Sequence, residues 1–199
     1  DIASRDNIQD TAFPLTNHLD LFNNYNILPK VSPDKSKVAI YSDKNGEMSI
    51  HILSMKDGKF LSKIATAQIS SKYEELHILQ PGVTWSPDGN HIAFTSKSGK
   101  NDALYIVDLN KKNNITKKIF NIESIYEPSW NPKYNKIAFI GYKDFASDIF
   151  TYNIDTDELK QLTNDLYTDS QVSWSKNGEE LLFVSDRNNN LESSPNVDL

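Results

Sequence analysis

Metal binding and hydrolysis are the two kinds of chemistry for which this sequence could supply side chains. Its histidines are few and widely spaced, at His18, His51, His77 and His91. Metal-binding histidines commonly recur at short spacings, as in His-Glu-x-x-His, and no such pair occurs here. The acidic run Asp155-x-Asp157-Glu158 lacks the spacing of a calcium-binding loop. We therefore predict no metal site and no bound cofactor.

Nucleophilic catalysis is not indicated either. The serines are numerous, but none lies in a Gly-x-Ser-x-Gly elbow, and no glycine-rich phosphate loop is present. The absence of cysteine excludes disulfides, thiolate ligands and a cysteine nucleophile. We predict that the chain has no catalytic residues of its own.

The charge distribution excludes two further classes of partner. The net charge is −6, and acidic and basic residues are interspersed along the 199 residues. A nucleic-acid surface needs a basic stripe to neutralise phosphates, so we expect no nucleic-acid partner. No apolar run approaches the roughly 20 residues that span a bilayer, so we expect no direct membrane insertion by this segment.

A turn motif that occurs four times indicates how the chain is organised. Its copies lie at residues 30–34, 84–89, 129–133 and 173–178, and the second reads Thr-Trp-Ser-Pro-Asp-Gly. The residues before the proline position are Ser32, Ser86, Asn131 and Ser175, separated by 54, 45 and 44 residues. A period of about 40–50 residues is typical of four-stranded propeller blades.

Each repeat predicts four strands in the same order. A first strand ends in Trp or its equivalent, and Pro, Ser and Gly then suit the successive positions of a tight turn. An alternating second strand follows, and polar turns lead to a third and a fourth strand. We therefore predict an all-β fold, a β-propeller of four-stranded antiparallel blades.

The repeats also predict boundaries. Blades are expected at residues 28–66, 81–121, 126–164 and, in part, 170–199, with a loop insertion at 67–80 that has room for a short helical turn. Residues 1–27 are expected to hold the outer strand of a preceding blade, at 13–16, and a linker. About three complete blades with a partial blade at each end predict a fragment of a six- to eight-bladed propeller, because an open arc exposes strand edges.

The three tryptophans, Trp85, Trp130 and Trp174, occupy one position of the repeat. A ligand platform and packing between blades are both compatible with aromatic residues there. Regular repetition favours packing, because each repeat contacts its neighbours through the same positions.

The repeats resemble a known family. Residues 85–96, Trp-Ser-Pro-Asp-Gly-Asn-His-Ile-Ala-Phe-Thr-Ser, are similar to the WD-like repeat of TolB-like β-propellers, as are residues 103–109 and Gln161-Leu-Thr163. The likeness covers about residues 28–190. Residues 73–85 resemble a subset of large bacterial envelope proteins. The resemblance implies a segment of a larger protein, located in the periplasm or cell envelope.

One face of such a propeller is a candidate for partner binding. Loops between the second and third strands share that face with the connections between blades, and Tyr and Arg are enriched in interface hot spots. The candidate partner-binding residues are Tyr73, Glu74, Lys97, Tyr126, Tyr142, Phe145, Tyr167 and Arg187. The alternative for this face is a solvated rim with no partner.

These features lead to one function and two rivals. We predict a non-catalytic scaffold for protein–protein interaction, with another envelope protein or another domain of the same chain as partner. The main alternative is the gating propeller of a prolyl-oligopeptidase-type serine peptidase whose catalytic domain lies outside this chain. A sugar-processing propeller is a third possibility, and it would need histidine ligands from blades that are absent here.

Overall fold

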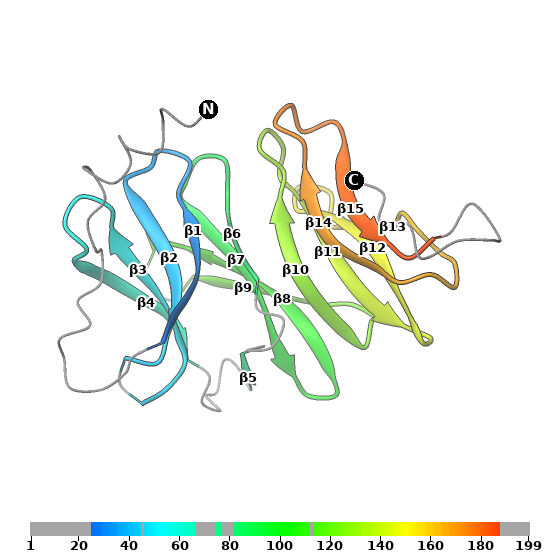
Figure 1. Ribbon diagram of the computed structural model, residues 1–199, viewed down its shortest axis with the longest axis horizontal. Coiled ribbons are helices and arrows are strands. Elements are labelled where there is room, and N and C mark those ends of the chain that lie inside the picture. The colour runs from blue at the N-terminus through cyan, green and yellow to red at the C-terminus, as the bar shows by residue number, and fades with distance from the viewer. Residues whose placement is uncertain (1–24, 45, 67–74, 77–81, 112–113, 188–199) are drawn as a thin grey trace, which may run out of the picture.

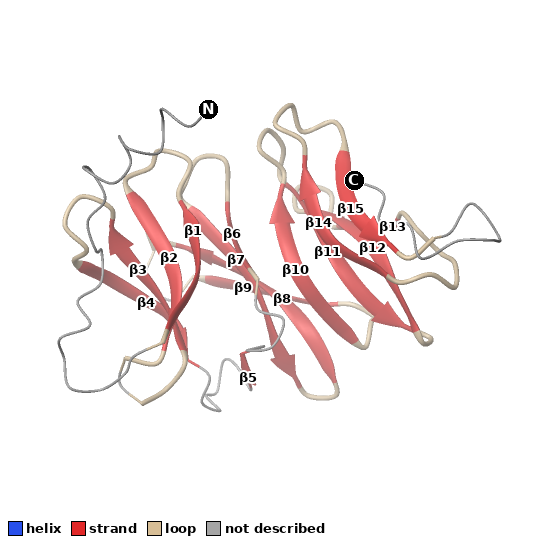
Figure 2. Cartoon of the chain, viewed as in Figure 1, coloured by secondary structure: helices blue, strands red, loops and turns tan. Residues whose placement is uncertain are grey.

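The computed structural model describes residues 25–44, 46–66, 75–76, 82–111 and 114–187. The described residues form strands, turns and loops and contain no helix (Figure 2). The strand predicted at 13–16 and most of the predicted insertion at 67–80 lie outside the described residues.

The strands form four consecutive antiparallel sheets, which we call blades I to IV (Figure 1). Blade I contains β1 (Asn26–Val31), β2 (Lys37–Ser42), β3 (Ser49–Ser54) and β4 (Phe60–Thr66), in that spatial order. Blade III contains β10 (Ser124–Trp130), β11 (Lys136–Lys143), β12 (Ala146–Asn153) and β13 (Glu158–Gln161). Blade IV consists of β14 (Asp169–Trp174) and β15 (Leu181–Ser185). The predicted four-stranded antiparallel blade is therefore confirmed in blades I and III.

Blade II differs from the prediction at one edge. It contains β5 (Glu75–Leu76), β6 (Val83–Trp85), β7 (His91–Ser98), β8 (Asn101–Asp108) and β9 (Ile115–Ile119). The short β6 pairs with β7 only as far as Phe94, and β5 pairs with β7 further along, at Ser96 and Lys97. Two residues of the predicted loop insertion are therefore strand, because β7 is longer than its inner neighbour.

The repeated turn is held by its serine. In blade II the backbone N–H of His91 donates to Ser86 Oγ at 2.9 Å, and Ser86 Oγ itself donates to Asp88. The hydrogen bonds from Ser86 and from the backbone of Asn90 lower the pKa of Asp88 to about 2. Ser32 and Ser175 accept the same backbone bond in blades I and IV. This shared geometry explains why Ser recurs before the proline position.

The tryptophans pack between blades. The Trp85 indole N–H donates to the Lys30 carbonyl of blade I at 2.8 Å, and Trp174 donates to Ser129 of blade III at 3.0 Å. Trp130 is buried in the core between blades II and III. These contacts confirm the packing role that the repeat predicted.

The innermost strands carry a repeated irregularity. The pairing register shifts within β1, β10 and β14, and each shift contains a residue with positive φ: Leu28, Glu127 and Gln171. These bulges border a hollow of about 590 Å³, which runs along β1, β6, β10 and β14. That hollow is the inner side of the arc, and it contains none of the predicted partner-binding residues.

Candidate protein-docking face

The loops predicted to share a face do lie together. These loops form a surface that we call the docking face. In blades II and III it lies along the lower edge of Figure 1. It consists of the described residues 99–100, 120–123, 144–145, 162–168 and 186–187. A parallel bridge joins Ser147 of β12 to Thr168, in the connection to blade IV. Between blades II and III, the Asp102 N–H donates to the Glu123 carbonyl at 3.3 Å. The hairpins of blades II and III are thus each tied to the next blade-to-blade connection.

A hollow of about 460 Å³ opens on this face between blades III and IV. Three of the predicted residues line it, Tyr126, Tyr142 and Phe145. Glu123 and Glu127 line it as well. We call these five residues the aromatic groove. Tyr126 and Tyr142 are half-buried, so their rings form part of a wall that the blades hold in place.

Phe145 lies at the tip of the β11–β12 hairpin and is 96% exposed. Lys143 pairs with Ala146, which leaves Asp144 and Phe145 as a two-residue turn with φ of 52° and 72°. A turn with two positive φ angles favours Asn-Gly, because side chains clash in the left-handed region. In blade II, Gly99 takes the left-handed conformation at the equivalent turn. Phe145 therefore sits in a strained conformation with almost none of its side chain buried.

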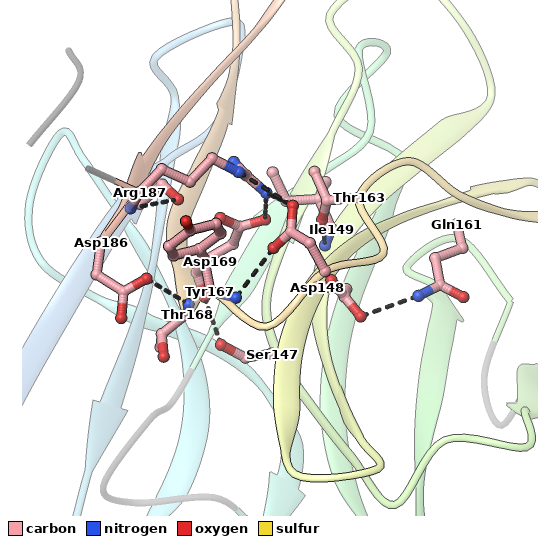
Figure 3. A network of polar contacts seen from close by, with 12 residues as sticks. Ser147, Asp148, Ile149, Gln161, Thr163, Tyr167, Thr168, Asp169, Asp186 and Arg187 are labelled. Carbon is pink, nitrogen blue, oxygen red and sulfur yellow. Dashed lines mark hydrogen bonds and ion pairs between the residues drawn. The ribbon is translucent and has the colours of Figure 1, made fainter. Parts of the chain in front are cut away.

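Arg187 is the centre of a polar network beside the groove (Figure 3). Its guanidinium donates to Asp165 Oδ2 at 2.6 and 3.1 Å and to Asp169 Oδ2 at 3.2 Å. Its side chain is 23% exposed, whereas that of Asp169 is fully buried. The guanidinium also lies 5.9 Å from the Tyr167 ring centre and 5.6 Å from that of Phe183. Arg187 thus joins β15 to the connection that enters blade IV.

The ionisation of this network follows from burial and pairing. Burial raises the pKa of Asp148, whose Oδ2 accepts a hydrogen bond from Gln161 at 2.9 Å. Burial acts in the same direction on Asp165, but the hydrogen bonds from Arg187 outweigh it and lower the pKa of that carboxyl. Burial acts against the charge of Arg187, and its bonds to Asp165 and Asp169 raise its pKa overall. Arg187 therefore stays charged and occupied with partners in its own chain.

Comparison with known proteins identifies the family. A sequence profile described as "TolB beta propeller domain" matches residues 66–191. The chain belongs to the TolB beta-propeller family. In structure it is similar to TolB from Acinetobacter baumannii, with a TM-score of 0.67 and 20% identity, covering 81% of this chain and 38% of the other. It is also similar to a protein from Agrobacterium tumefaciens described as "putative TolB". The TM-score is 0.64 at 19% sequence identity, and the match covers 84% of this chain and 58% of the other.

A more distant similarity reaches a Bacteroides ovatus protein described as a dipeptidyl aminopeptidase IV. Its TM-score is 0.59 at 13% identity, covering 85% of this chain and 27% of the other. The chain therefore spans well under two thirds of each of these three structures. At these identities the likeness establishes the propeller fold.

The other predicted partner-binding residues of this TolB-like propeller are not among the five residues of the aromatic groove. Tyr73 and Glu74 lie outside the described residues. Lys97, at the end of β7, lies 3.5 Å from the buried carboxylate of Asp102. Tyr167 is 42% exposed beside Arg187. Lys97 and Arg187 are thus paired with carboxylates of the same chain, whereas the side chains of Phe145 and Tyr167 are exposed.

The sequence analysis missed Leu166. This residue is 96% exposed in the connection between blades III and IV, next to Tyr167. The signal available was one apolar residue within the polar run Asn164-Asp165-Leu166 on a predicted surface loop. With Phe145 it gives the docking face of this TolB-like propeller two fully exposed apolar side chains.

Within the described residues, no three His, Asp or Glu side chains are grouped so as to hold a metal ion. His51 is buried and its ring contacts Phe60, while the His91 ring lies 6.3 Å from that of Trp130. The described part of the chain also includes no helix long and apolar enough to cross a membrane.

Proposed function

We propose that this TolB-like propeller is a rigid scaffold that docks a partner protein on the face around Phe145. The observation that carries the proposal is Phe145 itself, an aromatic side chain 96% exposed on a backbone with φ of 72°. A residue that is strained and buries almost nothing contributes little to the stability of its own fold, and strain of this kind clusters at functional sites.

The surroundings of Phe145 suit protein recognition. Interface hot spots are enriched in aromatic residues that fit well-packed pockets. Tyr126 and Tyr142 line the groove next to Phe145 and lie on strands β10 and β11 of blade III. Phe145 lies on the two-residue turn that the pairing of Lys143 with Ala146 closes. Preorganised side chains lose little conformational freedom on binding, so more of the contact energy appears as affinity.

We propose the bacterial cell envelope as the location of this protein. The family resemblance of the repeats is to bacterial propellers of the periplasm and envelope, and two similar structures are described as TolB. The partner in this proposal is another envelope protein or another domain of the same polypeptide.

Photo-crosslinking in cells that produce the full-length protein tests the proposal. A benzophenone amino acid replaces Phe145 in the full-length protein, and a control protein carries it at Tyr134. Tyr134 is 55% exposed in the turn between β10 and β11, away from the docking face. We expect a discrete protein adduct from position 145 and none from position 134. Absence of an adduct at 145, or the same adduct at both positions, would contradict the proposal.

A gating role in a serine peptidase is the second candidate. It is supported by the similarity in fold to the Bacteroides ovatus protein described as a dipeptidyl aminopeptidase IV. A fluorophosphonate probe that labels active-site serines distinguishes the two. Labelling of the full-length protein outside residues 1–199 favours the gating role, and an unlabelled protein favours the scaffold.

A further inference from the structure

We infer that the partner segment docking around Phe145 is cationic, with basic side chains placed between apolar ones. The inference rests on the proposed function and adds the chemistry of the partner. It comes from the charges around the β11–β12 hairpin, which borders two separate hollows.

The first hollow is the aromatic groove. Its lining includes the acidic residues Glu123, Glu127 and Asp169, and none of its lining residues, all of them described, is basic. Asp169 is neutralised by Arg187. Glu127 uses one oxygen, Oε2, to accept the Gln171 N–H at 2.7 Å. The groove therefore carries the negative charge of Glu123 and Glu127 beside two tyrosine rings.

The second hollow lies on the other flank of the hairpin and has a volume of about 530 Å³. Three carboxylates line it, Asp144, Asp148 and Asp165, together with one basic residue, Lys143. Lys143 Nζ lies 3.8 Å from Asp144, and Arg187 pairs with Asp165. Across both hollows, the carboxylates outnumber the cations that pair with them.

This arrangement matches a particular kind of ligand. Hollows lined by one sign of charge between low-dielectric walls concentrate the field and attract the opposite charge. An ammonium or guanidinium group gains from the glutamates and from the faces of Tyr126 and Tyr142. The exposed side chains of Phe145 and Leu166 lie beside these hollows and accept apolar neighbours of the basic residue. Anionic partners such as nucleic acid meet like charge here.

Three synthetic peptides of 12 residues test the inference against the full-length protein. They alternate Leu with Arg, with Gln or with Glu, and their affinities are measured by fluorescence anisotropy. We expect the Arg peptide to bind most tightly. Its advantage shrinks between about 0.05 and 0.5 M salt, because the screening length falls from above 10 Å to a few ångströms.

Matched variants locate the binding. Glu123→Gln with Glu127→Gln removes two charges from the groove, and Glu158→Gln with Glu180→Gln removes two from exposed positions off the docking face. We expect about tenfold weaker binding of the Arg peptide by the first variant and a change below about twofold by the second. Equal losses in both variants, no binding of the Arg peptide, or equal binding of the Arg and Gln peptides would overturn the inference.

The outcomes also separate this inference from the proposed function. One result is that the Gln or Glu peptide binds as tightly as the Arg peptide while Phe145→Ala abolishes that binding. That result would support docking around Phe145 and contradict a cationic partner. If the crosslinker at position 145 captures nothing and Phe145→Ala leaves every affinity unchanged, both fail.

Discussion

Replacing Phe145 with glycine is expected to stabilise the propeller while it weakens docking. A non-glycine residue in the left-handed region costs about 1–2 kcal/mol, and Phe145 has φ of 72°. Glycine relieves that strain, but its greater freedom in the unfolded chain costs roughly 0.5–1 kcal/mol. The ring is 96% exposed, so its removal forfeits almost no burial. The net expectation is a gain of about 0.5–1 kcal/mol in the free energy of unfolding.

Urea and thermal unfolding measure this gain. For a domain of this size about 1 kcal/mol corresponds to a rise of about 2–4 °C in Tm. Phe145→Ala is the matched control, because it removes the ring and keeps the strain, so its stability stays within about 0.5 kcal/mol of the parent. Gly99→Ala is the mirror change: it introduces strain at φ of 67°, where a Cβ meets no atom within 4 Å, and costs about 1 kcal/mol.

The reasoning fails if Phe145→Gly lowers the stability. That result would mean that the ring makes contacts in the free protein that offset the backbone strain. The exposed ring of Phe145 would then serve the stability of the propeller rather than a partner.

Three further changes test the network, the buried carboxyl and the joints between blades. Arg187→Met leaves the buried Asp169 without its cation and is expected to cost about 2–3 kcal/mol in urea unfolding; unchanged stability would show that Arg187 is free for a partner. Asp148→Asn is expected to stabilise the fold at pH 7 and to have no effect below about pH 4. The reason is that burial raises the pKa of Asp148, so the native carboxyl contributes stability when protonated and loses it as the pH rises; a pH-independent effect in unfolding curves would contradict this. Trp85→Phe breaks the bond to Lys30 and is expected to cost about 1 kcal/mol more than Trp130→Phe. The Nε1 of Trp130 has no hydrogen-bond partner among the described residues; equal losses would refute the role of that bond.

The architecture was predictable because the same pattern of turn and strand residues occurs in four copies. Ser32, Ser86 and Ser175 accept the same backbone hydrogen bond, and the indoles of Trp85 and Trp174 both donate to the preceding blade. The β5 pairing was not predictable, since it depends on how far β7 extends beyond β6.

The sequence predicted which residue types lie on the docking face. It did not predict which of them are already paired within the chain. Topology placed Phe145 on this face, because it lies in the turn between the second and third strands of blade III. Tyr142, predicted to lie in the same loop, lies instead near the end of strand β11, next to that turn. The engagement of Arg187 depends on Asp165 and Asp169, which lie 22 and 18 residues earlier in the chain and meet it only across the fold. Sequence patterns do not reveal such long-range pairs.

If Phe145 docks a protein partner, the affinity of that partner depends on its ring. The protein captured at position 145 is purified and titrated against the full-length parent, Phe145→Gly and Tyr134→Ala. A hot-spot aromatic contributes about 2 kcal/mol or more, so Phe145→Gly is expected to bind at least about 30-fold more weakly. Tyr134→Ala is expected to bind like the parent. Equal affinities for the parent and Phe145→Gly would contradict the account.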